Sequence, residues 1–170
     1  LWGIADRTDY DLSVHQKHSG ENLEYLDPET NEKYLPYVIE PSLGVERLLL
    51  AVLTSAYEEE TLSDGETREV LHFDPRVAPV KVAVLPLVNK LNDKALELYQ
   101  MLKKYFVCEY DSSGKIGKRY RRQDAIGTPY CLTVDFETLE NNSVTLRNRD
   151  SMEQFRINID DLLKYLNDKF

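Results

Sequence analysis

The chain has 170 residues and a formal net charge of −9; 42% of its residues are hydrophobic and 30% are charged. With only seven glycines and seven prolines, this composition favours a packed core and excludes a fibrous or disordered chain. No apolar run approaches the roughly 20 residues that a membrane-spanning helix needs. Two cysteines are too few for a disulfide framework. We therefore expect a cytoplasmic protein with no membrane partner.

The charge is unevenly distributed. Residues 1–78 carry 6 basic and 17 acidic side chains, and residues 79–170 carry 15 basic and 13 acidic ones, so the two net charges are −11 and +2. Such asymmetry predicts two functional units. The chain begins with Leu1 rather than Met, and its opening run is typical of the middle of a strand. We expect it to be a piece of a longer protein.

The first half predicts a mixture of strands and helices. Residues 1–7 favour a strand, and the polar stretch 8–18 has helical spacing with a glycine stop just after it. Residues 22–26 and 34–39 predict an antiparallel hairpin around a turn-rich segment. Residues 44–59 predict the clearest helix of the chain, because their apolar side chains form a single stripe. That stripe consists of Val45, Leu48, Leu49, Val52, Leu53, Ala56 and Tyr57.

The polar residues 58–79 separate the two charge regimes, and their glycine and prolines favour a linker. Beyond them, residues 80–87 form a nearly continuous apolar run, which is typical of a strand covered on both faces. A helical stripe over 93–105 and a short strand over 107–110 follow. Strand, helix and strand in this order indicate a βαβ unit.

The remainder predicts one basic helix, three strands and a closing helix. The basic helix spans 118–125, the strands 130–136, 143–149 and 154–159, and the closing helix 160–169. The second unit therefore has the order β-α-β-α-β-β-β-α, which predicts an α/β domain with a mixed sheet flanked by helices. The first unit adds antiparallel strands to this domain, and we assign the whole chain to the α/β class.

The stretch from Ile39 to Arg47 is the most informative part of the sequence. A strand delivers the carboxylate of Glu40 and the hydroxyl of Ser42, Gly44 permits close approach of the backbone, and a helix then begins. The helix dipole disfavours Arg47 in a first turn, so a phosphate or carboxylate partner explains it better than helix stability does. The pattern suits a ligand with an ammonium and a phosphate. An ordinary strand-turn-helix corner is an equally good interpretation.

The same stretch resembles the third signature motif of class II aminoacyl-tRNA synthetases, in which Gly-x-x-Arg opens a helix beneath ATP. Over its whole length the chain is similar to the homodimeric glycyl-tRNA synthetases, and Glu40-Pro41-Ser42 distinguishes that family within class II. The other matching segments are 1–12, 36–42, 75–79 and 117–129.

The resemblance implies roles for individual residues. Arg47 would contact ATP and Glu40 would surround the ammonium of glycine; these two are the candidate catalytic residues. Because glycine has no side chain to grip, its selection must come from excluding anything larger. The implied glycine site consists of Glu40, Pro41, Ser42, Leu43 and Gly44. The implied ATP site consists of Leu1, Gly44, Val45, Glu46 and Arg47.

The resemblance also implies an organisation and a set of partners. Residues 1–60 would be the last part of a catalytic domain, 61–79 a linker and 80–170 an anticodon-binding domain. ATP with Mg²⁺, glycine and glycine tRNA would be the ligands, and the full-length protein would be a homodimer. The first and second class II motifs are not visible, so we expect the chain to be inactive alone.

A basic run at residues 115–122 contains five cations and no acid. Such cations attract backbone phosphates, although a charge run by itself more often indicates a solvated helix face. The resemblance favours an interface for the anticodon loop, while part of the run could instead hold the domain together. The candidate tRNA contacts are Lys118, Arg119, Arg121 and Arg122.

Weaker signals give no further site. His15 and His18 have helical spacing but no third strong ligand nearby, so we expect no metal ligand in this chain. Cys108 and Cys131 are typical of small buried apolar residues. Two other functions stay open: a non-catalytic RNA-binding or polymerase-accessory protein with the same fold, and a plain α/β domain with an acidic partner.

Overall fold

A computed structural model describes residues 1–63 and 65–170. The chain divides into two compact units, Leu1–Ala51 and Val52–Phe170, and each is described by itself. Among the described residues, no helix has both the length and the apolar character needed to span a membrane.

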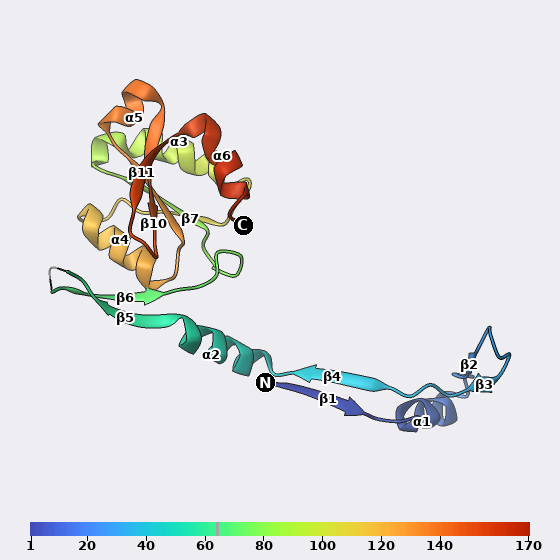
Figure 1. Ribbon diagram of the computed structural model, residues 1–170. Helices are drawn as coiled ribbons and strands as arrows, with labels where there is room; N and C mark the ends of the chain where they lie inside the picture. Colours follow the sequence, from blue (N-terminus) through green and yellow to red (C-terminus); the bar gives the residue numbers. More distant parts are fainter. Residues whose placement is uncertain (64) are drawn as a thin grey trace. The chain divides into compact units, whose positions relative to one another are not determined.

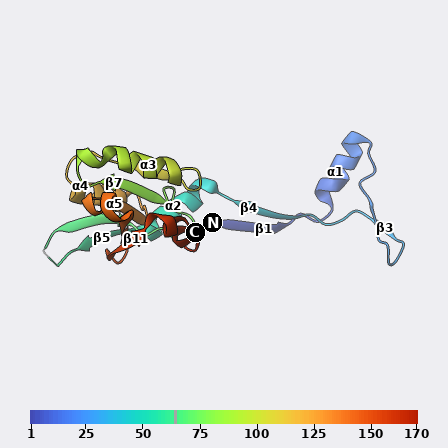
Figure 2. The same ribbon diagram turned by 90° about the horizontal axis from the view of Figure 1, so that it is seen from above.

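The first unit is built on a two-stranded ribbon. Strand β1 (Trp2–Asp6) pairs antiparallel with β4 (Ile39–Leu43), as Figures 1 and 2 show. Between them lie helix α1 (Tyr10–Ser19) and the small hairpin of β2 (Tyr25–Leu26) and β3 (Lys33–Tyr34). The hairpin is confirmed but shorter than expected, because the chain leaves it after β3 and pairs with β1 instead.

Helix α2 (Val45–Ala56) ends earlier than its apolar stripe predicts, and a second hairpin follows. Strands β5 (Tyr57–Thr61) and β6 (Thr67–Leu71) pair antiparallel. The acidic run 58–60, where the predicted helix 44–59 ends and the predicted linker 58–79 begins, therefore lies in a strand. The segment 61–79, expected to be a linker, contains β6, whose Val70 is fully buried.

The second unit contains a five-stranded mixed sheet in the order β11-β10-β9-β7-β8. Strand β7 runs parallel to β8 and β9, whereas β10 is antiparallel to β9 and β11. The mixed sheet predicted from the sequence is thus confirmed. Its strands are β7 (Val82–Pro86), β8 (Cys108–Tyr110), β9 (Tyr130–Val134), β10 (Ser143–Asn148) and β11 (Gln154–Asn158).

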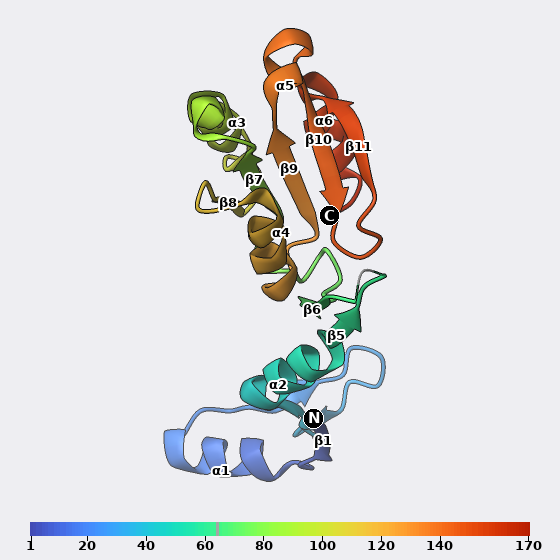
Figure 3. The same cartoon turned by 90° about the vertical axis from the view of Figure 1, so that its left-hand side faces the viewer.

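Helices cover both faces of this sheet. A 3-10 turn η1 (Asn89–Leu91) leads into α3 (Asn92–Leu102), which packs with α6 (Ile159–Asn167) on the larger core of one face. Helix α4 (Ile116–Ala125) lies on the opposite face, and Figure 3 shows it in front of the sheet with α6 behind β10 and β11. Hairpin strand β6 packs against α4.

The position of β7 inside the sheet explains why its sequence is apolar throughout. Val82 and Val84 face the larger core, while Ala83 and Leu85 face α4, and all four are fully buried. Successive side chains of a strand point to opposite faces, so a central strand covered by helices on both sides has no polar face.

The sequence missed one helix of this unit, α5 (Phe136–Asn141). Its first residue was expected to end the preceding strand. Asp135 caps the helix by accepting a hydrogen bond from the Thr138 amide at 3.1 Å, and the Thr138 hydroxyl accepts one from the Asp135 amide at 3.0 Å. This capping box turns the chain out of the sheet.

Candidate ligand pocket and nucleic-acid interface

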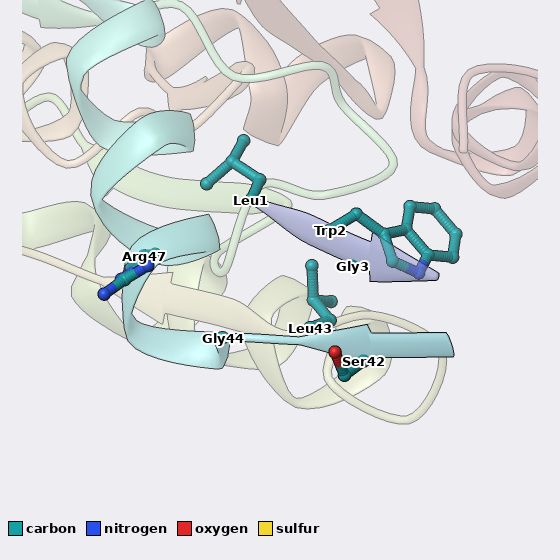
Figure 4. Close-up of a pocket in the computed structure, with 7 residues that line it drawn as sticks. All are labelled: Leu1, Trp2, Gly3, Ser42, Leu43, Gly44 and Arg47. Carbon is teal, nitrogen blue, oxygen red and sulfur yellow. The ribbon is translucent and has the colours of Figure 1, made fainter. Parts of the chain in front are cut away.

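A pocket of about 450 Å³ lies in the first unit, where β1, β4 and the start of α2 meet. Figure 4 shows the side chains around it, with Arg47 on the first turn of α2 and Ser42 on β4. The lining residues are Leu1, Trp2, Gly3, Ser42, Leu43, Gly44 and Arg47.

The local sequence explains how Arg47 reaches this pocket. Gly44 accepts the first helical hydrogen bond, from the amide of Leu48 at 2.9 Å, so α2 begins directly after the strand. The first turn of a helix carries partial positive charge and unpaired amide groups, and Arg47 adds a full charge beside it. This corner of the pocket is suited to an anion.

Two glycines shape the pocket through close packing. A Cβ on Gly3 would meet the Ser42 hydroxyl oxygen at 3.0 Å, and one on Gly44 would touch the Arg47 side chain at 3.5 Å. The first distance is tighter than ordinary side-chain contact. Gly3 therefore allows β1 to run beside Ser42 at the pocket wall.

Glu40 has a partner that the sequence analysis missed. Nη1 of Arg7 lies 3.1 Å from Oε2 of Glu40, and Arg7 also bonds to both carboxylate oxygens of Asp11. The hydrogen bond and charge of Asp11, with the charge of Glu40, raise the pKa of Arg7. Arg7 thus forms a surface ion pair with Glu40, a contact hidden in the sequence because the two residues are 33 positions apart.

The predicted site residues are only partly gathered at the pocket. Leu1, Ser42, Leu43, Gly44 and Arg47 line it, and the structure adds Trp2 and Gly3 from β1. Of the described residues expected to form the glycine and ATP sites, four do not line this pocket. These are Glu40, Pro41, Val45 and Glu46.

The second candidate site is the exposed side of α4. Lys118 is exposed on this helix and Lys115 just before it. Both border a pocket of about 620 Å³ that also receives side chains from β10 and β11. Its lining residues are Glu66, Lys115, Ile116, Gly117, Lys118, Tyr120, Arg121, Arg147, Met152 and Gln154.

Arg119, expected to contact RNA, is instead buried, with 3% of its surface exposed. Its guanidinium donates hydrogen bonds to the carbonyl oxygens of Ser112 at 2.9 Å, Gly114 at 2.6 Å and Ser113 at 3.3 Å, and to that of Pro86. Three of these acceptors belong to the loop before α4, and Pro86 is the last residue of β7. Arg119 therefore holds the domain together and is not available to a partner.

The other two arginines of α4 remain at the surface. Arg121 lies 3.8 Å from Asp124 and 3.9 Å from Glu66, while Arg122 bonds to Asp111 at 2.9 Å. Burial opposes ionisation of Asp111, but hydrogen bonds from the Ser113 amide and Arg122 outweigh it and hold its pKa below the usual value. Arg122 is therefore partly engaged by its own domain.

Tyr120 and Arg147 form a stacked pair beside the same pocket. The Arg147 guanidinium carbon lies 4.8 Å from the centre of the Tyr120 ring, and the Tyr120 hydroxyl bonds to that of Thr133 at 2.5 Å. Burial raises the pKa of Tyr120. Lys115 belongs to the basic run, so the sequence could have predicted it as a residue of this pocket. Arg147 lies on β10, and only the order of strands in the sheet brings it next to α4.

The two cysteines have the environment expected for apolar residues. Burial raises the pKa of Cys108 to about 11 and that of Cys131 to about 12, so both thiols stay protonated at neutral pH.

Comparison with known families gives a match over most of the second unit. Residues 81–169 match the model of a family described as "Anticodon binding domain". This range includes the whole five-stranded sheet, α4 and the closing helix α6.

Individual relatives are similar over nearly the whole chain. A Clostridium tetani protein named glycine–tRNA ligase is 64% identical over 99% of this chain, and one of the same name from Clostridium acetobutylicum is 63% identical over 99%. The chain covers 36% and 37% of those proteins, so it spans just over a third of the length of the curated relatives it matches.

A solved structure supports the fold. The RNA-binding domain of threonyl-tRNA synthetase from Cryptosporidium parvum superimposes with a TM-score of 0.67, covering 87% of this chain and 35% of that one. At 21% sequence identity, this likeness concerns the arrangement of the elements alone.

Proposed function

The chain belongs to the family of anticodon binding domains, and from this we propose that its second unit binds the anticodon end of a tRNA. One observation carries the proposal: the family match at residues 81–169 includes α4, whose exposed cations border a pocket open to a ligand. Phosphate groups attract such cations, and unpaired bases stack on aromatic planes such as the ring of Tyr120, which lines the same pocket.

We further propose that the whole protein is a glycine–tRNA ligase. The support is the identity of 63–64% to proteins of that name, which extends through the first unit as well. In this reaction the glycine carboxylate attacks the α-phosphorus of ATP, giving glycyl-adenylate and pyrophosphate. A ribose hydroxyl at the tRNA end then attacks the acyl carbon and releases AMP.

The first-unit pocket would contribute to that reaction by binding and orienting. Arg47, beside the start of α2, would pair with a phosphate of ATP, where a planar cation donates several hydrogen bonds. Glu40, paired with Arg7, would attract the glycine ammonium. In-line transfer at phosphorus depends on such positioning and charge stabilisation more than on a protein nucleophile.

The proposal includes Mg²⁺ bound together with ATP. It also includes a homodimeric full-length protein and a cytoplasmic location. The seven described residues that line the pocket include no carboxylate, so they do not form a Mg²⁺ site by themselves. The metal ion would be held by the phosphates and by ligands elsewhere. A non-catalytic RNA-binding protein is the weaker alternative, because Ser42 and Arg47 both line one pocket that such a protein would not need.

The interface is tested by charge reversal on the full-length protein. We expect K115E/K118E to weaken binding to glycine tRNA. The plot of log Kobs against log salt should become less steep, by about one unit of slope for each lost phosphate contact. Binding is measured by filter retention between 50 and 200 mM salt.

The matched control is K103E/K104E, which makes the same charge change just after α3, the helix that covers the opposite face of the sheet. Equal loss of affinity in both variants would show a general charge effect, and unchanged binding by K115E/K118E would contradict the proposed interface.

A further inference from the structure

One histidine of the second unit lies between carboxylates from two different parts of the fold. His72 follows β6, and its Nδ1 lies 2.6 Å from Oδ1 of Asp150 in the turn between β10 and β11. Its Nε2 lies 2.8 Å from Oε1 of Glu60 and 3.6 Å from Oε2 of Glu58. The two glutamates are alternate residues of β5, so their side chains share one face of the strand.

This arrangement needs a positive charge beside the imidazole. A neutral imidazole has one N–H donor and one lone pair. If the N–H points to Asp150, the lone pair of Nε2 faces the oxygens of Glu58 and Glu60 and is repelled by them. Either a second proton or a metal cation at Nε2 removes the repulsion.

The surrounding arginines hold the carboxylates in position. Arg68, which is fully buried, donates to the other oxygen of Glu60 at 2.6 Å, and Arg149 donates to both oxygens of Asp150 at 2.7 and 3.0 Å. These hydrogen bonds fix the orientation of both carboxylates around His72.

We propose that Glu58, Glu60 and His72 bind one zinc ion. Among the described residues, the three form one group whose ligand atoms all lie within 4.8 Å of one another. A cation about 2 Å from each ligand atom can bridge atoms up to about 4 Å apart, which fits both Nε2 distances. One imidazole and two carboxylates favour zinc over magnesium, and the Asp150–His72 bond matches the carboxylate–histidine–zinc arrangement.

The metal would reinforce the end of the β5–β6 hairpin and its link to the turn after β10. Glu58 and Glu60 belong to β5, and His72 follows β6 with its amide bonded to the Ala56 carbonyl at 2.7 Å. Through Asp150 the site also reaches the turn after β10. Zinc would thus fasten the β5–β6 hairpin to the edge of the domain, a role independent of the proposed ligase activity.

The test measures zinc content in the full-length protein after chelation and dialysis against Zn²⁺ alone. We expect the natural protein to bind one equivalent more than H72Q by elemental analysis. D150N keeps all three ligands but loses the group that orients His72, so its zinc affinity should fall about 10–100-fold. Zinc should also raise the melting temperature of the natural protein more than that of H72Q.

Two controls keep the outcome decisive. H15Q/H18Q removes the other two histidines of the chain and should retain the full zinc content. If H72Q fails to fold, E58Q asks the same question, because the Glu58 side chain is 63% exposed. Equal zinc content in the natural protein, H72Q and E58Q, with protons on both ring nitrogens of His72 in a nitrogen-15 spectrum, would overturn the proposal.

Discussion

Arg119 shows that a residue's chemistry does not reveal which way its side chain faces. It stands in a run of cations on a helix, yet it is the member that points into the domain and donates only to backbone carbonyl oxygens. A helix turns 100° per residue, so neighbours in a basic run separate onto different faces. The surface therefore retains Lys118, Arg121 and Arg122 but not Arg119.

We expect R119A to lower the free energy of unfolding by at least about 3 kcal/mol. Hydrogen bonds to a charged group contribute about 1.5–3 kcal/mol each, and the variant leaves several carbonyl oxygens without their donor. Urea unfolding of the 170-residue chain, followed by circular dichroism, measures the change.

The control for this variant is R121A on the same helix. Its contacts with carboxylates are 3.8 Å or longer, so we expect a loss below about 1 kcal/mol. Similar losses for both variants would contradict the structural role assigned to Arg119.

At the scale of elements, a buried charge cluster fastens the β5–β6 hairpin to the sheet. Asp124 of α4 accepts two bonds from Arg147 of β10, at 2.7 and 3.0 Å, and one from Arg68 of β6 at 3.1 Å. Arg68 and Asp124 are fully buried at their side chains, and Arg147 is nearly so. One carboxylate thereby joins three elements that are distant in sequence.

We expect D124N to destabilise the chain by about 3–5 kcal/mol, because it leaves two buried guanidinium groups without their shared counter-charge. The measurement is again urea unfolding at neutral pH. E97Q provides the same chemical change in an exposed pair, where Lys94 lies 3.1 Å away, and should cost less than about 1 kcal/mol. A D124N loss as small as that of E97Q would contradict a clamping role.

At the scale of the molecule, the pocket of the first unit gathers only part of the residues expected around glycine and ATP. The pocket holds a single arginine, and four of the nine residues expected around glycine and ATP lie outside its lining. We therefore expect the isolated 170-residue chain to give no glycine-dependent exchange between ATP and pyrophosphate, while the full-length protein does.

The positive control for that assay is tRNA binding by the same isolated chain, which we propose to reside in the second unit. Exchange activity in the isolated chain would show that its own residues suffice for adenylate formation. Loss of both exchange and tRNA binding would point to a misfolded preparation.

The sequence by itself determined the mixed sheet and, apart from α5, the order of its strands and helices, as well as the strand-to-helix corner before Arg47. Those features follow from local patterns: apolar periodicity, glycine stops and a short motif. Only the tertiary structure decided that Arg119 is buried, that Arg7 pairs with Glu40, and that Glu58 and Glu60 face His72 from a strand. Each of these depends on which distant segments pack together. Alternate residues of a strand share one face, so Glu58 and Glu60 point to the same side because β5 forms a strand with β6 rather than the end of a helix.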